Sequence, residues 1–341
     1  MNVHVLETIR QSVGPACVAS IRNDQLDHVK AYIQDFTKHP FSATRTGIVL
    51  DTATDSQGKM IRPRLVLMAA SYGPHSEREK ETVYKVAAIV EMTHLASLIH
   101  DDIVDDAPLR RGKPSVQGVY GKHAAVYAGD FIMSRITYHL MREGLNEAGM
   151  VLANTVEAMC AGEIGQSRHR YDAAMTIDQY KAHIHGKTAA LFMACCRLGA
   201  LVSGCSEVVT QRLEGVGECL GYMFQMRDDL LDFSPDSATI GKASQQDFRE
   251  GIYTMPVLLA NEHPGGNLAL RPYFEKSRAG TLQREDMERL TQIVTEFGGM
   301  ERAWQAIAAE QAKAERLIQA LPANPMSHQL LRLIQKVGSP T

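Results

Sequence analysis

Several patterns that would assign this chain to a particular class of protein are missing from its sequence. No apolar run reaches the roughly 18 residues of a membrane span, so no integral membrane segment is expected. The nearest run, residues 188–204, is interrupted by Arg197 and predicts a buried helix. The first residues lack the basic region and apolar stretch of a secretory signal, so a cytoplasmic location is expected.

Cysteine pairs and an excess of one charge are also missing. The six cysteines form no CxxC pair and no Cys/His metal spacing, which predicts reduced, small apolar residues. The net charge is −3, from 36 basic and 39 acidic residues, so no overall field favours nucleic acid as a partner. There is no glycine-rich phosphate loop and no alternation of strands and helices. These absences exclude the common nucleotide-binding folds.

Long helical periodicity dominates the 341 residues, and alternating strand patterns are scarce. We therefore predict an all-α, single-domain chain over residues 1–341. Its parts would be an N-terminal helical region (1–45), a core that carries the motifs (58–256) and C-terminal helices (265–341). Helices are predicted over residues 5–37, 59–72, 77–106, 122–144, 147–168, 176–184, 187–204, 206–233, 252–261, 283–297 and 300–320.

The stretch "SLIHDDIVDDAPLRRGKPS" (97–115) concentrates negative charge at the end of a predicted helix. With about 100° per residue, His94, Asp101 and Asp105 lie on one stripe, and Asp102 lies to one side. Carboxylates four residues apart repel each other, and the helix C-terminus adds negative potential. Either a solvated surface cluster or a Mg²⁺ site, whose ligands are oxygens, would account for this stretch.

A second copy of the motif favours the metal site. The stretch "QMRDDLLDF" (225–233) repeats the spacing, with Asp228 lying 127 positions after Asp101. This second helix is mostly apolar, where uncompensated acids would be costly. Two such helices on facing walls of a helical cavity could hold metal between them. We interpret the two motifs as one metal site.

Cations elsewhere suggest what the metal would hold. Lys59 and Arg62 share a helix face, Lys187 and Thr188 are predicted at a helix start, and Lys242 follows the second acidic helix. Each cation alone is more typical of a solvated surface charge. Together with the acidic motifs they predict a diphosphate site, because aspartates reach phosphate through Mg²⁺ while Lys and Arg reach it directly.

In these motifs the chain resembles the trans-isoprenyl diphosphate synthases of the polyprenyl synthetase family. The shared motifs are GKxxRP (58–63), "HLASLIHDDIVDDAPLRRGKPS" (94–115), "GD" (129–130), "GKTA" (186–189), "FQMRDDLLD" (224–232) and "GKASQQD…GIYTMP" (241–256). The resemblance implies a prenyltransferase helical bundle around a deep central cavity, usually as a homodimer. It further implies elongation of an allylic diphosphate by isopentenyl diphosphate, with three Mg²⁺ ions per active site.

The resemblance also implies a role for each matching residue. The metal-binding residues that the resemblance implies are Asp101, Asp102, Asp105, Asp228, Asp229 and Asp232. Among them, Asp101, Asp105 and Asp228 would be the main ligands. The implied contacts to the allylic diphosphate are Arg110, Lys187 and Lys242. The implied contacts to isopentenyl diphosphate are Lys59, Arg62, His94 and Arg111. The implied catalytic residues are Lys187, Thr188 and Gln225, and the last two would turn oxygens toward the developing allylic cation.

One position departs from the family pattern. A lysine often stands in "GKxTxP", where this chain reads "GIYTMP" with Ile252. We expect an altered grip on diphosphate rather than loss of activity.

Other functions remain open at this point. A terpene cyclase would share the fold, but the second DDxxD motif together with Lys59 and Arg62 argues against it. A non-catalytic partner subunit would be expected to have lost aspartates, and none is lost. The sequence leaves open a shorter geranylgeranyl or farnesyl product. It also leaves open a catalytic subunit that acts only with a small, dissimilar partner.

Product length generates the first test. In the family, the residues four and five positions before the first aspartate form the cavity floor, and here they are the small Ser97 and Ala96. We predict a medium-to-long polyprenyl product. Ala96→Phe or Ser97→Phe should shorten it, because a ring would block the growing chain. Chromatography of the products is the measurement, and unchanged length would reject the open floor.

Overall fold

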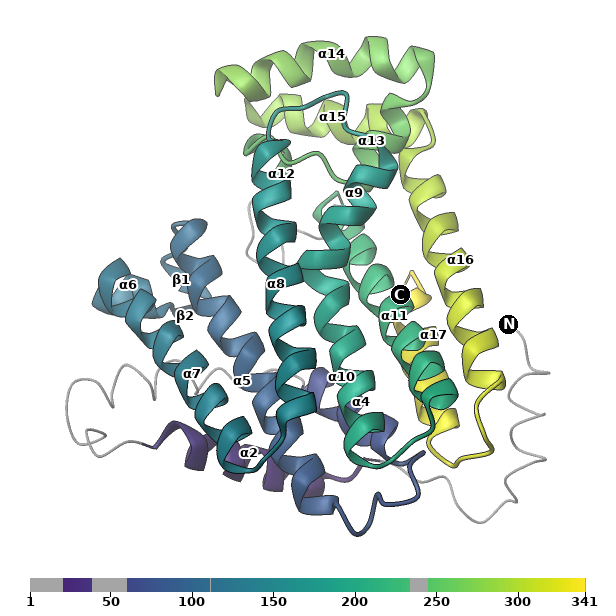
Figure 1. Cartoon of the computed structure of the whole chain (residues 1–341). Coiled ribbons are helices and arrows are strands. Elements are labelled where there is room, and N and C mark those ends of the chain that lie inside the picture. The colour runs from purple at the N-terminus through teal and green to yellow at the C-terminus, as the bar shows by residue number, and fades with distance from the viewer. Residues whose placement is uncertain (1–20, 39–59, 111, 234–244, 341) are drawn as a thin grey trace. The chain divides into compact units, whose positions relative to one another are not determined.

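The computed structural model describes residues 21–38, 60–110, 112–233 and 245–340, which are almost entirely helical (Figure 1). The one sheet among these residues is a two-stranded antiparallel hairpin of β1 (Leu109–Arg110) and β2 (Lys113–Pro114). The predicted all-α class is confirmed. The prediction of a single domain stays a prediction.

The helices follow one another with short connections. The first half of the described chain contains α2 (Asn23–Thr37), α4 (Ile61–Ala70), α5 (Lys80–Val104), α6 (Val116–Tyr120), α7 (Lys122–Arg142) and α8 (Asn146–Arg168). The middle contains α9 (Ile177–Ile184), the π-helix η1 (His185–Ala189), α10 (Ala190–Val202), α11 (Glu207–Asp232) and α12 (Gln246–Arg249). The end contains α13 (Met255–Asn261), α14 (Pro264–Ala279), α15 (Arg284–Glu296), α16 (Gly299–Gln319) and α17 (Ser327–Gly338).

The long helices agree with the predicted ranges where these are described; residues 5–20 of the first predicted range lie outside the described residues. C-terminal helices were expected over 265–341, but no individual range was predicted for α14 or α17, nor for the short α6 and α12. The prolines and glycines of "EHPGGNLALRP" indicate a loop, yet α14 begins there. Pro264 occupies the first turn, where the missing N–H would have no helical partner, and the His263 Nδ1 accepts a hydrogen bond from Gly265 N at 3.1 Å. Pro272 lies inside the same helix. Burial of Leu270 and Phe274 outweighs the cost of that proline.

The described residues fall into two compact units. The first contains those described residues that fall within 1–154, 191–214 and 320–330, and the second contains those within 155–190, 215–319 and 331–341. The core of the first unit is α5, against which α2, α4 and α7 pack. By length and apolar composition α5 could cross a membrane. However, 72% of its most apolar window is buried within the protein, as is usual for the core helix of a globular unit.

The second unit has its own core around α13, which packs against α14, α15 and α16. An aromatic cluster lies beside it. The ring of Tyr253 is 5.0 Å from that of Phe248 and 4.6 Å from that of Phe274. Because these rings are buried, they fix the segment 252–254, which also lines the pocket of this unit.

A buried histidine at the contact between α2 and α7 predicts how the folding stability depends on pH. His139 is 1% exposed, stacks on Phe36 at 3.7 Å between ring centroids, and lies 3.0 Å from the Arg135 Nη2. Burial lowers the pKa of His139 to about 4, and the charge of Arg135 adds to this effect. The unfolded chain takes up this proton near pH 6.5, so folding stability from this group is lost as pH falls from about 6.5 toward 4.

His139→Gln should therefore reduce the pH dependence of stability. We expect the difference in the free energy of unfolding between the unaltered protein and the variant to shrink by about 2 kcal/mol between pH 7.5 and 5. Urea unfolding at both pH values measures it. His123→Gln, at an exposed position of the same helix, is the control. Equal slopes for His139→Gln and the unaltered protein would contradict the expectation.

Candidate active site

The first acidic motif lies at the end of α5, in the first unit. The helix ends at Val104, and Asp105 is its C-cap, whose N–H donates to the Asp101 carbonyl at 2.8 Å. Asp105 is exposed and Asp101 is half-buried, whereas Asp102 is only 4% exposed. Asp101 and Asp105, which the spacing places on one stripe, are therefore the more exposed carboxyl groups. Asp102, which lies to one side of that stripe, is turned inward.

Arg110 compensates the buried Asp102. Its Nε donates to the Asp102 Oδ1 at 2.7 Å, and the β1–β2 hairpin fixes it there through the pairing of Arg110 with Lys113. Burial raises the pKa of the Asp102 carboxyl, while the charge and hydrogen bond of Arg110 oppose the rise. Arg110 was predicted to hold the allylic diphosphate. In this structure its guanidinium also binds the motif itself, so Asp102 and Arg110 position each other.

The predicted contacts to isopentenyl diphosphate are described only in part. Lys59 and Arg111, and Lys242 of the allylic set, lie outside the described residues. Arg62 lies in the first turn of α4, and its guanidinium carbon is 5.0 Å from the centroid of the Phe192 ring. His94 lies half-buried on α5. Both belong to the first unit.

The chain-length positions also lie on α5. Ala96 is buried, and Ser97 is half-buried with its hydroxyl donating to the His94 carbonyl at 2.9 Å. Both residues are small, as the open-floor interpretation requires, but the interpretation stays a prediction.

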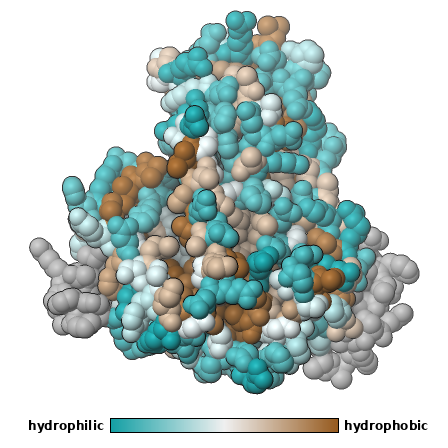
Figure 2. All heavy atoms as spheres, viewed as in Figure 1, coloured by the Kyte–Doolittle hydropathy of each residue, from teal (hydrophilic) through white to brown (hydrophobic). Residues whose placement is uncertain are grey.

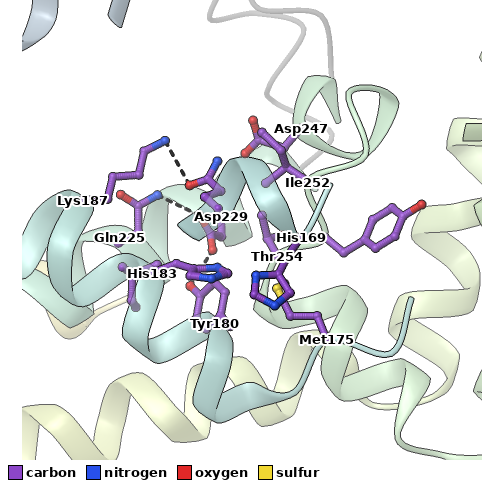
Figure 3. Close-up of a pocket in the computed structure, with 13 residues that line it drawn as sticks. His169, Met175, Tyr180, His183, Lys187, Gln225, Asp229, Asp247, Ile252 and Thr254 are labelled. Atoms are coloured by element: carbon purple, nitrogen blue, oxygen red, sulfur yellow. Dashed lines mark hydrogen bonds between the residues drawn. The ribbon is translucent and has the colours of Figure 1, made fainter. Parts of the chain in front are cut away.

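The second unit contains a pocket around the second acidic motif (Figure 3). It is formed by the end of α8, α9, η1, α11 and the segment 245–254. The lining residues are Gln166, His169, Met175, Tyr180, His183, Ile184, Lys187, Gln225, Asp229, Asp247, Ile252, Tyr253 and Thr254. Lys187 of η1 meets Gln225 and Asp229 of α11 here, about forty residues later in the sequence.

A chain of hydrogen bonds runs through this pocket. The Thr188 hydroxyl donates to the Gln225 Oε1 at 2.7 Å, and the Gln225 Nε2 donates to the Asp229 Oδ1 at 2.9 Å. The Tyr180 hydroxyl donates to the other oxygen of Asp229 at 2.5 Å. The orientation of the Gln225 amide is therefore fixed from both ends. This connects two of the predicted catalytic residues to the acidic motif.

The sequence predicted that Lys187 and Thr188 lie at a helix start, and this prediction was wrong. The π-helix η1 joins α9 to α10 without a break, so no helix N-terminus is present there to bind an anion. A π turn widens the helix locally and changes the direction of the side chains that follow it. The Lys187 ammonium lies 3.3 Å from Glu163 Oε1 and 3.4 Å from Gln166 Oε1, both on α8.

Glycines let the backbone of η1 touch two helices. A Cβ at Gly186 would lie 2.4 Å from the Ala158 carbonyl oxygen and 2.8 Å from the Gly162 Cα of α8. A Cβ at Gly221 of α11 would lie 2.4 Å from the Ala189 Cα. These distances are too short for any side chain, so glycine is required where α8 and α11 meet η1.

The Asp229 carboxyl is the most perturbed acid of the pocket. Burial raises its pKa to about 7. The hydrogen bonds from Tyr180 and Gln225 favour the charged form, while the negative charges of Asp247 and Asp228 oppose it. Cations bound beside Asp229 would favour its charged form and so lower this pKa.

Sequence reasoning missed several residues of this pocket. Tyr180 lies two helical turns before Lys187, and this spacing was a usable signal. Asp247 ends the quoted motif "GKASQQD", but no role was assigned to it. His169 and His183 carry no pattern that separates them from the other histidines of the chain. Their place in the pocket becomes visible in the structure alone.

The acidic residues fit Mg²⁺. Among the described residues, no three His, Cys, Asp or Glu side chains lie close enough to hold a metal ion by themselves. Mg²⁺ does not need such a cage, because one or two carboxylates, waters and substrate phosphates complete its octahedron. The carboxylates of Asp101, Asp105, Asp228 and Asp232 offer the hard oxygen ligands that it prefers. Asp102 and Asp229 are held by internal hydrogen bonds, and Asp232 accepts one from Gln245 N at 3.0 Å through Oδ1.

Comparison with known proteins shows the family to which this chain belongs. The family described as polyprenyl synthetase matches residues 46–293. This chain belongs to the polyprenyl synthetase family. It is accordingly a prenyltransferase, and the motifs quoted above fall within the matched range.

Individual members are similar along most of the chain. Heptaprenyl diphosphate synthase component 2 of Geobacillus stearothermophilus is 33% identical over 281 residues, which cover 82% of this chain and 85% of that protein. The crystal structure of a decaprenyl diphosphate synthase from Rhodobacter capsulatus matches with a TM-score of 0.83 and 30% identity, covering 97% and 98% of the two chains. A polyprenyl synthase from Caulobacter crescentus CB15, whose structure contains calcium and isoprenyl diphosphate, matches with a TM-score of 0.83, 27% identity and coverage of 98% and 97%.

The glycine contacts of η1 generate a prediction. Gly186→Ala should lower the free energy of unfolding by about 1–3 kcal/mol, because the new methyl group meets backbone atoms that cannot rotate away. Gly149→Ala is the matched control in α8, since the nearest atom to its Cβ is 3.9 Å away. It should stabilise the helix by roughly 0.5–1 kcal/mol. Denaturant unfolding of both variants is the measurement, and equal effects would refute the close approach.

Proposed function

We propose that this prenyltransferase elongates an allylic diphosphate with isopentenyl diphosphate by head-to-tail 1′-4 condensation, giving an all-trans medium- or long-chain polyprenyl diphosphate. One observation carries the proposal. In a chain of this family, Lys187, Gln225 and Asp229 line one pocket of the second unit, and Thr188 donates a hydrogen bond to Gln225. The names of the heptaprenyl and decaprenyl relatives support a long product.

The chemistry follows from charge. Magnesium ions, when bound, would neutralise the negative charge that grows on the leaving diphosphate. Lys187, held by Glu163 and Gln166 at the pocket, would bind a diphosphate oxygen directly. The oxygens of Thr188 and Gln225 would face the allylic carbon as it becomes positive, because a fixed dipole stabilises charge without reorganising. No side-chain nucleophile is needed, and the lost proton would pass to the departed diphosphate.

Both acidic motifs would have to act on one diphosphate group. The first motif lies in the first unit and the second in the second unit. That they face each other across a cavity is part of this proposal. The calcium and isoprenyl diphosphate found in the Caulobacter protein support a divalent ion and this substrate class for the present chain.

We also infer that the chain acts as a homodimer. Tyr138 and Met141 lie eleven and fourteen residues after Tyr127 along α7, so the three side chains fall within about 60° on its surface. They are 72%, 50% and 67% exposed, which is unusual for large apolar side chains. On the face that Figure 2 shows, apolar residues gather at several places among the hydrophilic ones. A second copy would cover this stripe.

A heteromer is the second candidate, because the Geobacillus relative is called component 2 of its enzyme. The same reaction would then need a second, dissimilar subunit. The two candidates differ in whether the purified chain is active by itself.

The test incubates the purified chain with Mg²⁺, farnesyl diphosphate and labelled isopentenyl diphosphate. We expect incorporation into products of the heptaprenyl to decaprenyl class by a dimeric species. Asp101→Asn should reduce the rate by about a hundredfold or more, because a metal ligand is lost. Activity that appears only after a second subunit is added would indicate the heteromer. No incorporation under either condition would overturn the proposal.

A further inference from the structure

Two histidines form part of the pocket wall and take no part in the mechanism described above. His169 follows α8, and His183 lies in the last turn of α9. Their ring centroids are 4.9 Å apart, with 43° between the ring planes. Figure 3 shows the two rings side by side, close to Tyr180 and Asp229.

His169 is held by hydrogen bonds of its own. Its Nδ1 donates to the Gly165 carbonyl at 3.0 Å, which leaves Nε2 as an acceptor. The Gln179 Nε2 lies 3.4 Å from that nitrogen, and the Gln179 Oε1 accepts from Thr176 N at 2.8 Å, which fixes the amide in this orientation. The His169 ring is therefore fixed in place, and His183 packs against it.

His183 differs in having no such partners. It is 8% exposed, and among the described residues no hydrogen bond to its ring nitrogens is found. Gly165 lies beneath it, since a Cβ there would be 3.3 Å from the His183 Cδ2. No ring nitrogen of His183 is among the fully buried side-chain atoms that lack a partner, and the residue lines the pocket. Its ring nitrogens are therefore accessible to a ligand in that pocket.

The surroundings of His183 favour an anionic ligand. Lys187, Gln166 and Gln225 line the same pocket and offer N–H groups. Burial lowers the pKa of His183, and the neighbouring His169 adds to the effect. A neutral imidazole still donates one hydrogen bond. It does so without a positive charge that would repel metal ions near Asp228 and Asp232.

We propose that His183 donates a hydrogen bond to a phosphate oxygen of the bound allylic diphosphate and thereby sets part of the affinity for that group. The proposal rests on the proposed function of this pocket as a diphosphate site. It adds a donor beside Ile252, a lining residue that brings no polar group. His169 acts as a positioning residue, because its ring holds that of His183 in place.

The test measures binding of inorganic diphosphate by calorimetry in the presence of Mg²⁺, together with steady-state kinetics. His183→Leu should weaken diphosphate binding about tenfold, the size expected for one hydrogen bond to a charged group. KM for the allylic diphosphate should rise by a similar factor, while KM for isopentenyl diphosphate and kcat change little. His183→Gln, which keeps a donor, should stay within about threefold of the unaltered protein.

Two further variants sharpen the result. Ile252→Lys added to His183→Leu should restore diphosphate binding, because it returns a donor to the same pocket. His185→Gln is the matched control. His185 lies two residues along the helix, and its Nδ1 is 3.0 Å from the Tyr222 hydroxyl of α11 rather than in the pocket lining. It should bind diphosphate as the unaltered protein does.

The outcomes separate this proposal from the proposed function. Unchanged diphosphate binding by His183→Leu would overturn the role of His183, even if the chain makes polyprenyl products. A protein that binds diphosphate through His183 but makes no product would instead contradict the proposed reaction. In case leucine disturbs folding, ¹⁵N-labelled histidine in the unaltered protein provides a second measurement. Inorganic diphosphate should shift the ring resonances of His183 and leave those of His185 in place, and no shift would refute the contact.

Discussion

The direct contact of backbone with backbone around η1 is the constraint on which the pocket depends. Gly162, Gly186 and Gly221 leave no β-carbons between η1 and its neighbours α8 and α11. The helices therefore approach closely enough for Thr188 to reach Gln225 and for Lys187 to reach Gln166. A larger residue at any of these glycines would separate the groups that must act together, even though none of the three carries a functional side chain.

Buried acids are the second constraint, and the protein treats them alike in both units. Asp102 is buried and held by Arg110, and Asp229 is buried and held by Tyr180 and Gln225. In each motif the neighbouring aspartates, Asp101 and Asp228, are more exposed. The inward carboxyl fixes the end of its helix, because its hydrogen bonds reach another element. In the proposed function the more exposed carboxyls would bind metal, so one short motif would serve both structure and chemistry.

The fold was predictable where a helix is long and its apolar residues recur regularly, as in α5, α7 and α11. It was not predictable for α14, because Pro264, Gly265 and Gly266 indicate a loop by local preference alone. Packing of Leu270 and Phe274 against neighbouring helices overrides that preference. The break predicted between 184 and 187 was wrong for a related reason. A π turn keeps the helix continuous where the sequence suggests an end.

The sequence by itself determined the all-α class, the two aspartate motifs and the family, since these depend on residue spacing along one chain and on ordered motifs. It also indicated Lys187, Thr188 and Gln225 as a group. Only the tertiary structure decided which groups touch: Tyr180 on Asp229, Arg110 on Asp102, and His183 beside His169. The physical reason is that such contacts join residues distant in sequence. Their geometry depends on how closely neighbouring helices pack, a distance that no local pattern encodes.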